Sequence, residues 1–421
     1  MRIAVVGAGI IGVTSAYELA AVGHEVTVFE QGGSIAAGAS FAHAGLDGAG
    51  YAVAWSPLAV AGGLFGLALR SRLPAALAMS TNPGSATWTL KWLRANRKAA
   101  QHELHHRQHR LAVYSRACTA ELTQSLHLDF ERSSGVTVVA RSAADSQRLL
   151  RASAVLDQIG VRYKQLTADE CRSLEPGLNP QAALHGAVHL PDEGAGNSRE
   201  FAHLIKQHAQ RQGARFVFSA QVLAIQPGAQ PELTVARGAE RQREAFDAVV
   251  LCTGLASRDL LAPLGLKLPL IGVSGLSVTA ALRLDEIHPH LGPASVLLDP
   301  RHGVSIVRAG NRLRACGGAR VAGLSRTQEA AALKSTYRAL NEWFPGAART
   351  AQAQHWQGAS PTLPDGLPVI GRSGLTGIWL NLGHGSVGWT LSCGSARLLS
   401  ALIADITPEI NTEGLGVDRF R

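Results

Sequence analysis

The sequence contains few cysteines, and they are far apart. Five cysteines occur among 421 residues, none of them in a CxxC pair. This number and spacing argue against a disulfide framework and against a zinc module. We therefore expect reduced thiols and a cytoplasmic protein. No cleavable signal peptide is expected either, because glycines needed in the mature protein begin at residue 7.

Charge is also sparse, and no strong cluster of one sign stands out. Charged residues make up 17% of the chain and hydrophobic residues 46%, which excludes a disordered protein. The net charge is +9, but most basic residues are scattered, whereas nucleic-acid-binding proteins concentrate them in a patch or a motif. We expect no nucleic-acid partner. The densest basic stretch, residues 91–110, is compatible with acidic lipid headgroups.

Residues 49–69 carry no charge, a length that suits a membrane-spanning helix. Pro57, Gly62, Gly63 and Gly66 interrupt the stretch, however, and it follows directly on the motifs described next. We interpret it as a loop and helix over a substrate entrance, open to peripheral contact with the inner face of the membrane rather than spanning it.

The clearest motif opens the chain. A β-branched run at residues 2–6 leads into Gly7-Ala8-Gly9-Ile10-Ile11-Gly12, a helical segment follows at 13–22, and a second strand at 25–29 ends on Glu30. This is the fingerprint of a dinucleotide site, in which glycines allow a tight turn and close approach of a pyrophosphate, and the acid binds ribose hydroxyls. FAD and NAD share it, whereas Glu30 disfavours the 2′-phosphate of NADP.

A second GxGxxG follows the apolar strand at 378–382 and precedes a helix from Trp389. No later strand ends in an acid, so this is not a second nucleotide domain. We predict that the helix N-terminus faces the anionic ring carbonyl of a flavin bound at the first site. Another apolar strand, within 246–254, ends on the turn Thr253-Gly254.

Residues 102–106 read His-Glu-Leu-His-His and match the HExxH motif of zinc peptidases. Several arginines surround them and would repel a dication, and no third ligand is evident. We expect no metal site, and a zinc peptidase remains the remote alternative.

Four segments together carry a family resemblance: Ala-His-Ala-Gly at 42–45, Leu-Cys-Thr-Gly at 251–254, Leu-Pro-Asp-Gly-Leu-Pro-Val-Ile-Gly at 363–371, and Gly-His-Gly-Ser-Val-Gly-Trp-Thr at 383–390. Over nearly its whole length the chain resembles the FAD-dependent D-amino acid oxidase superfamily, most strongly its bacterial D-amino acid dehydrogenase branch. The resemblance implies an α/β fold with a Rossmann-like FAD-binding domain and a second, discontinuous α+β substrate domain.

The resemblance also implies a chemistry. Non-covalent FAD would accept a hydride at N5 from the carbon that bears the nitrogen of an amino acid or related amine, and the resulting imine would hydrolyse in water. Electrons would leave to a quinone or an electron-transfer protein. A flavin subunit of a larger amine, imino acid or opine dehydrogenase complex is the alternative, and neither the substrate nor the oligomeric state follows from the sequence.

Carried over by position, the family pattern names a cofactor set and a catalytic set. The residues expected to hold FAD are Gly7, Gly9, Ile10, Ile11, Gly12, Glu30, Gln31, Ser40, Ala42, His43, Ala44, Gly45, Val222, Thr253, Gly254, Gly383, His384, Gly385, Ser386, Val387, Gly388 and Trp389. The expected catalytic residues are His43, Tyr51, Ser360 and His384, although His384 is as well suited to cap its helix. The FAD domain is expected at 1–50, 190–262 and 355–421, and the substrate domain at 51–189 and 263–354. Val222 is expected within a strand over 215–225, and the substrate domain is expected to contain strands at 295–298, 303–308 and 312–316 followed by a helix at 327–343.

The sequence departs from the family at the substrate carboxylate. Ser360 stands where relatives place an arginine that binds the carboxylate as a fork. Ser274 and Leu276 also replace a basic residue and a tyrosine. Either another arginine, for which Arg308 is the candidate, takes over, or the substrate is not a simple free amino acid.

Overall fold

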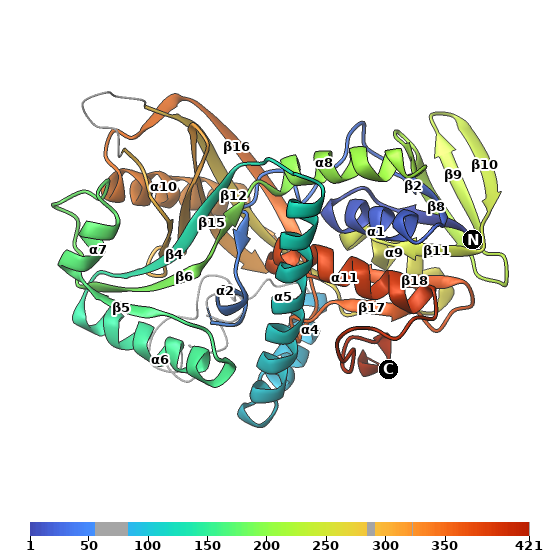
Figure 1. Cartoon of the computed structure of the whole chain (residues 1–421), viewed down its shortest axis with the longest axis horizontal. Helices are drawn as coiled ribbons and strands as arrows, with labels where there is room; N and C mark the ends of the chain where they lie inside the picture. The colour runs from blue at the N-terminus through green and yellow to red at the C-terminus, as the bar shows by residue number, and fades with distance from the viewer. Residues whose placement is uncertain (55–82, 284–290, 322, 421) are drawn as a thin grey trace.

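The protein is described by a computed structural model that covers residues 1–54, 83–283, 291–321 and 323–420. Figure 1 shows two β-rich halves side by side, with both chain termini in the same half. Of the charge-free stretch, only the part up to Ala54 falls within the described residues.

The half that contains the termini is built on a six-stranded sheet in the order β17-β18-β11-β1-β2-β7. Every pairing in it is parallel except that of β17 with β18. The inner strands are apolar runs because helices and strands cover both faces. The six strands are β1 (Arg2–Val6), β2 (Glu25–Phe29), β7 (Arg215–Val217), β11 (Ala248–Leu251), β17 (Val369–Arg372) and β18 (Ile378–Leu382).

One face of this sheet packs against α1 (Ile10–Ala21), α8 (Ser198–Arg211) and α11 (Gly388–Ile403). Hydroxyl groups join the two helices from opposite ends of the chain: Thr14 Oγ1 donates to the carbonyl of Ser392 at 3.2 Å, and Ser400 Oγ to that of Glu18 at 3.2 Å. The other face carries a small antiparallel sheet and a short helical segment. These elements are β8 (Gln221–Gln226), β9 (Glu232–Arg237), β10 (Glu240–Ala245), η2 (Gly254–Ala256), α9 (Ser257–Leu261) and η3 (Ala262–Leu264).

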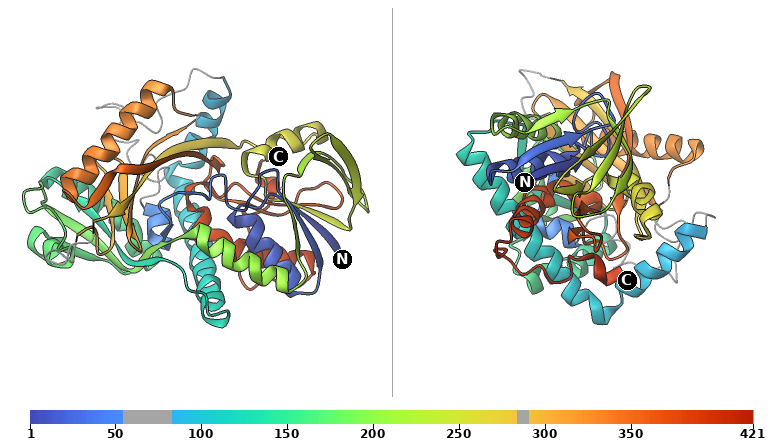
Figure 2. Two further views of the ribbon diagram at one scale, coloured as in Figure 1. Left: turned by 90° about the horizontal axis from the view of Figure 1, so that it is seen from above. Right: turned by 90° about the vertical axis from the view of Figure 1, so that its right-hand side faces the viewer.

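The other half contains a nine-stranded mixed sheet. Its strands are β3 (Leu46–Asp47), β4 (Arg132–Ala140), β5 (Lys164–Thr167), β6 (Gly186–Gly196), β12 (Ile271–Leu282), β13 (Val296–Asp299), β14 (Val304–Ala309), β15 (Arg312–Val321) and β16 (Ala348–Thr362). Long β6, β12 and β16 reach toward the first half, as the view from above in Figure 2 shows. The expected domain boundaries near 190 and 355 fall inside β6 and β16, and the division into domains stays a proposal.

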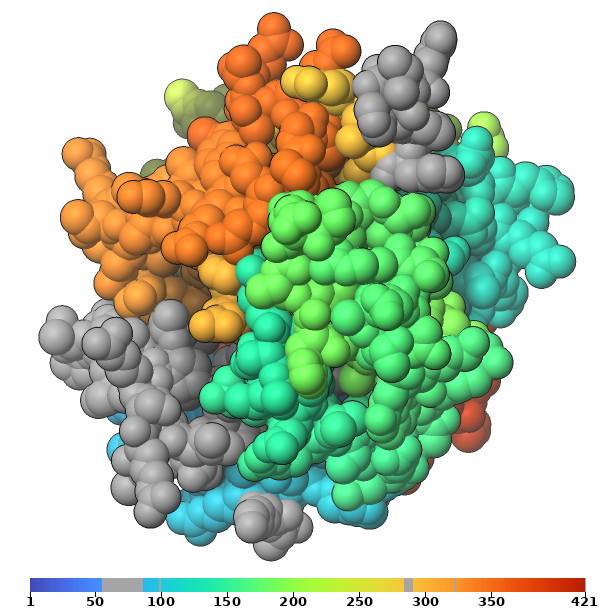
Figure 3. Space-filling model, turned by 90° about the vertical axis from the view of Figure 1, so that its left-hand side faces the viewer, coloured from blue at the N-terminus to red at the C-terminus, as the bar shows by residue number. Residues whose placement is uncertain are grey.

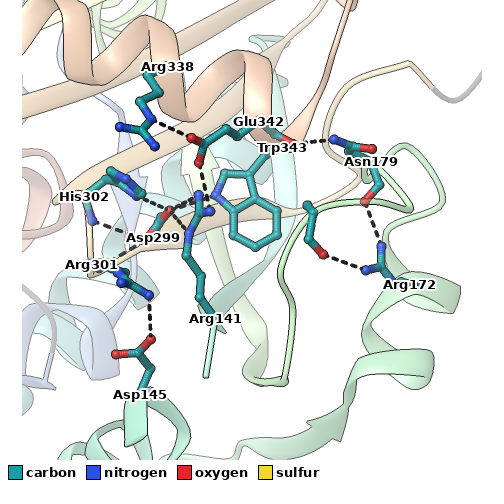
Figure 4. A network of polar contacts seen from close by, with 11 residues as sticks. Arg141, Asp145, Arg172, Asn179, Asp299, Arg301, His302, Arg338, Glu342 and Trp343 are labelled. Carbon is teal, nitrogen blue, oxygen red and sulfur yellow. Dashed lines mark hydrogen bonds and ion pairs between the residues drawn. The ribbon is translucent and has the colours of Figure 1, made fainter. Parts of the chain in front are cut away.

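Helix α10 (Arg326–Trp343) covers one face of the second sheet together with α7 (Ala168–Leu174). Helix α6 (Ala143–Ile159) packs on the other face, in the core cluster that the two halves share. Figure 3 shows α10 in orange next to the green segment that contains α7. A buried carboxylate, Asp299, anchors the helix: Arg141 Nη2 lies 2.8 Å from its Oδ2, and Trp343 Nε1 donates to the same oxygen at 2.8 Å (Figure 4). Burial opposes the charge of Asp299, but these bonds and one from His302 outweigh it and lower the pKa of Asp299.

Three helices lie between the halves or beside them: α2 (Ala49–Ala54), α4 (Pro83–Ala95) and α5 (Lys98–Ser125). Helix α5 packs against α11 and carries the HExxH sequence. There His102 Nε2 lies 3.1 Å from His106 Nε2, and Glu103 is paired with Arg107 at 2.8 Å. Within the described residues no group of three or more metal-ligating side chains is assembled, and no helix there is both long enough and apolar enough to cross a bilayer.

Two short 3₁₀ helices complete the C-terminal part of the chain. They are η4 (Gly385–Val387), which precedes α11, and η5 (Val417–Phe420). Strands β1, β2 and β18 have the bounds expected from sequence, and the strand and helix alternation expected after residue 295 is present as β13, β14, β15 and α10.

Candidate active site

The turn between β1 and α1 forms a cradle that depends on three glycines in different ways. Gly7 has a φ of +97°, and a Cβ there would lie 2.8 Å from the carbonyl oxygen of Cys252. A Cβ on Gly12 would overlap the carbonyl oxygen of Gly7, so only glycine lets α1 pack this closely on β1. Gly9 is different: its φ is −66° and the nearest atom to an added Cβ is Ser40 Oγ at 3.6 Å. The open space beside Gly9 belongs to a cavity.

The N-terminus of α1 and the carboxylate of Glu30 both face this cavity. The first N–H groups of a helix have no partner within it, and of these the N–H of Ile10 donates to Ser40 Oγ at 3.1 Å. Glu30 Oε2 accepts the N–H of Ala8 at 2.8 Å, and Oε1 accepts the N–H of Gly32 at 2.7 Å. The carboxylate expected to bind ribose is therefore held in place by the N–H groups of Ala8 and Gly32.

The chain between 215 and 225 is not one strand, and that expectation is wrong. It forms β7 and β8 in two different sheets, because Ser219 turns with a φ of +51° and its N–H donates to the carbonyl of Gly32 at 3.0 Å. The turn joins this segment to the loop after β2. Val222, on β8, nevertheless lines the cavity, as does Gln31.

The loop that contains His43 runs along the cavity and is fixed from several sides. A Cβ on Gly45, whose φ is +69°, would overlap the carbonyl oxygen of Gly196, and the N–H of Gly196 donates to the carbonyl of Gly45 at 2.8 Å. Arg314 Nη1 donates to the carbonyl of His43 at 3.0 Å, and Cys316 Sγ lies 4.0 Å from the carbonyl of Ala42. Strands β6 and β15 thus hold this loop against the site.

Both ring nitrogens of His43 are occupied by the protein. Nδ1 accepts the N–H of Gly45 at 2.9 Å, so the ring proton is assigned to Nε2, which lies 2.7 Å from Ser198 Oγ. Burial and the charge of Arg314 lower the pKa of His43 to about 4. The imidazole is neutral and engaged, which favours shaping the loop over the catalytic role expected for it.

The second glycine motif forms a turn that leads into α11. Gly383 has a φ of +83°, and His384 follows it, 3% exposed. His384 makes no side-chain cap to the helix, and burial lowers its pKa to about 3. Within the described residues, its Nε2 and the Nε1 of Trp389 are buried without a hydrogen-bond partner. Both residues contribute other atoms to the cavity wall, while these two nitrogens are shielded from it.

The cavity has a volume of about 1410 Å³, more than the roughly 300–1,000 Å³ of a pocket for one drug-sized ligand. All the expected cofactor and catalytic residues line it except Gly12 and Val387, which are buried in the packing of α1 and α11. Thr253 and Gly254 reach it from the end of β11. The glycine cradle at Gly9 and the placed carboxylate of Glu30 fit FAD, and the volume leaves room for a substrate.

Tyr51 and Ser360 also line the cavity, and the part of it beside them is the expected substrate end. Tyr51 is 7% exposed, and burial raises the pKa of its phenol. Ser360 lies on β16 in register with Val273 of β12. Within the described part of the chain, neither hydroxyl has a hydrogen-bond partner. Both are therefore available to a small ligand.

The arginine expected to replace the missing carboxylate ligand lies elsewhere. Arg308 Nε donates to the carbonyl of Gly310 at 3.1 Å, outside the cavity wall. The arginines that do line the cavity, among the residues described, are Arg301 and Arg320. Arg301 lies 3.8 Å from Asp145, whereas Arg320 has no ion pair with any described residue. The role considered for Arg308 is not supported.

Several residues of the site were missed from sequence. Arg314 and Cys316 alternate with the buried Leu313 and Ala315, so the two-residue period of the strand could have placed them on the face toward the site. Ser198, 155 positions from His43, carried no comparable signal.

Comparison with known proteins identifies relatives along the full chain. The family model described as FAD dependent oxidoreductase matches residues 2–402. A D-amino acid dehydrogenase of Cereibacter sphaeroides is 36% identical over 100% of this chain and 95% of its own length. One of Azorhizobium caulinodans is 35% identical, with 100% of both chains covered.

Solved structures with the same fold are more distant in sequence. Glycine oxidase from Geobacillus kaustophilus has a TM-score of 0.72 at 23% identity, with 99% of this chain and 98% of that one covered. Iminodiacetate oxidase from Chelativorans sp. BNC1 has a TM-score of 0.68 at 20% identity, with 99% and 98% covered. At this identity the likeness concerns the fold.

Proposed function

The chain belongs to the family of FAD-dependent oxidoreductases, and from that premise we propose that it is an amino acid or amine dehydrogenase of the D-amino acid dehydrogenase type. The observation that carries the proposal is one continuous cavity that joins the dinucleotide cradle at Gly9 to the hydroxyls of Tyr51 and Ser360. The names of the full-length relatives support the same substrate class.

When bound, FAD supplies a hydride acceptor for the C–H bond next to the amine. The chain's own residues bind the cofactor, orient the substrate and exclude water. Glu30 and the N-terminus of α1 would hold the nucleotide half of FAD, and His384 and Trp389 would wall its ring end. The neutral His43 keeps its own loop in place against the cavity. With no free base among these side chains, the amine enters as its neutral form, and the imine is released to water for hydrolysis.

The wall around Ser360 suits a substrate whose carboxylate is absent, masked or placed differently from that of D-alanine. A serine offers one neutral hydrogen bond, whereas a desolvated carboxylate needs a charged, forked donor. We propose N-substituted amino acids, imino acids and larger amines as the preferred class. Arg320 is the cavity arginine free to meet an anionic group of such a substrate.

The electrons are proposed to leave to a quinone or an electron-transfer protein. The second glycine motif forms part of the wall of the first site and does not belong to a second nucleotide-binding domain. Within the described residues there is therefore no second cradle for a dinucleotide such as NAD to accept the electrons. The basic surface of α4 and α5 is the proposed place of peripheral contact with the membrane where such acceptors are found.

The test is anaerobic reduction of the purified protein by a panel of D-amino acids, L-amino acids, imino acids and N-methyl amines. Bleaching of the flavin absorbance by one class, with release of the flavin on acid precipitation, supports the proposal and non-covalent binding. If no class bleaches a flavin that dithionite reduces normally, the proposed substrate class is wrong. Yellow colour retained in the acid pellet would contradict non-covalent attachment.

A further inference from the structure

Glu193, on β6, lies beneath the short helix that carries Tyr51. Its side chain is buried, and each of its carboxylate oxygens accepts a backbone N–H group from the first turn of α2. Oε1 accepts the N–H of Gly50 at 2.5 Å, and Oε2 accepts that of Tyr51 at 3.1 Å. The carboxylate thus supplies acceptors that the helix itself cannot provide for these groups.

The neighbouring glycines leave room for this carboxylate. A Cβ on Gly48 would overlap Glu193 Oε2, and one on Gly50 would lie 2.9 Å from Oε1. The N–H of Gly48 also meets Thr390 Oγ1, on α11, at 3.4 Å. The segment before α2 is therefore tied both to Glu193 and to the helix that walls the flavin end.

The groups that face Glu193 come from three other elements. They are Tyr51 on α2, Asp47 on β3, and Arg116 on α5, whose Nε lies 3.4 Å from Asp47 Oδ1. Burial raises the pKa of Glu193 to about 7, with Asp47 acting in the same direction, while the two N–H groups and Arg116 act against it. The carboxyl group therefore changes charge within the ordinary working range of pH.

We propose that Glu193 is a positioning residue: as a carboxylate it fixes α2 and thereby sets the place of the Tyr51 hydroxyl at the substrate end of the cavity. The inference rests on the proposed function, since the position of the Tyr51 hydroxyl affects the reaction only if the substrate binds beside it. Protonation leaves one good acceptor for two N–H groups, because a protonated oxygen donates rather than accepts. Below pH 7, α2 is held less firmly.

The first test follows the backbone of α2 directly and needs no substrate. Amide hydrogen exchange of the peptide containing residues 46–54 is measured in the FAD-loaded protein at pH 6 and pH 8, corrected for intrinsic exchange. We expect more protection at pH 8. Glu193→Gln, with a single acceptor, should show the weaker protection at both pH values. The control is Asp192→Asn, which removes a neighbouring exposed acid paired with Arg162.

The second test asks whether Glu193 acts through Tyr51. Glu193→Gln should lower kcat/KM at pH 8 about tenfold or more, the factor produced by losing one hydrogen bond to a charged group. The ratio of wild type to variant should fall toward pH 6, and Glu193→Asp should restore part of the loss. In a Tyr51→Phe background, Glu193→Gln should have little further effect.

Two results would overturn the proposal: exchange that is independent of pH and unchanged in Glu193→Gln, or additive losses in the double variant. Failure of the proposed function gives a different pattern. If the wild-type protein oxidises no member of the panel, the kinetic arm has no signal, while the exchange of residues 46–54 still decides whether Glu193 holds α2.

Discussion

Gly9→Ala separates cofactor binding from folding, because the added Cβ would point into the cavity and would clash with no atom of the described residues. Its nearest protein atom would be Ser40 Oγ at 3.6 Å, an ordinary contact, and the φ of −66° suits alanine. Gly9 is the N-cap of α1, where alanine in place of glycine costs about 0.5–1 kcal/mol. We expect the FAD-free protein to lose no more stability than that. Gly12→Ala is the contrasting variant, since its Cβ would overlap the carbonyl of Gly7 and should disrupt folding itself.

FAD binding should respond very differently. The methyl group at Gly9 occupies the space through which a pyrophosphate approaches the N–H groups of α1. Losing two hydrogen bonds to a charged group, at about 1.5–3 kcal/mol each, weakens FAD by about 3–6 kcal/mol, or roughly two to four decades in Kd. The assay is titration of deflavinated protein by quenching of FAD fluorescence, with thermal unfolding of the same sample as control. Wild-type affinity in Gly9→Ala would refute the assignment of this cradle to the pyrophosphate.

Three further predictions concern other parts of the molecule. Glu30→Gln keeps one acceptor for the N–H groups of the turn and should weaken FAD by about 1.5–3 kcal/mol; an unchanged Kd would count against the ribose role. Ser360→Arg should raise kcat/KM for D-alanine about tenfold or more by supplying the forked cation, whereas Arg308→Ala should not change it, and the opposite pattern would contradict this substrate argument. Asp299→Asn should lower the free energy of unfolding at pH 7 by about 3–5 kcal/mol. The pKa of Asp299 in the folded protein lies below its ordinary value. The stabilisation by its carboxylate is therefore present above the pKa of the unfolded chain and is lost as pH falls through the pKa of the folded protein. Equal denaturant midpoints for Asp299→Asn and the wild type at pH 7 would contradict the anchoring role.

The nucleotide end of the site could be predicted from sequence because its determinants are local. Gly7, Gly9, Gly12 and Glu30 act within one strand–turn–helix–strand unit, in which the spacing along the chain sets the geometry. The same holds for the turn from Gly383, where glycine conformation and the following helix are neighbours in sequence.

The substrate end could not be predicted in the same way because its contacts join distant segments. Glu193 meets Gly50 across 143 positions, and no pattern near either residue indicates the other. Arg308 illustrates the converse: it lies on a correctly predicted strand, but its side chain turns to the carbonyl of Gly310. Register and side-chain direction in the nine-stranded sheet are set by tertiary packing, which a single sequence does not reveal.

The pairing of α1 with α11 has a consequence for how the protein is made. The first helix of the chain and the last long one are joined through Thr14 and Ser400, and the turn before α11 walls the ring end of a cavity whose other end is built by residues 7–12. A ribosome delivers Ser392 378 positions after Thr14. The emerging chain thus presents a half-built pocket until α11 has left the exit tunnel and docked, and lasting capture of FAD must wait for that step.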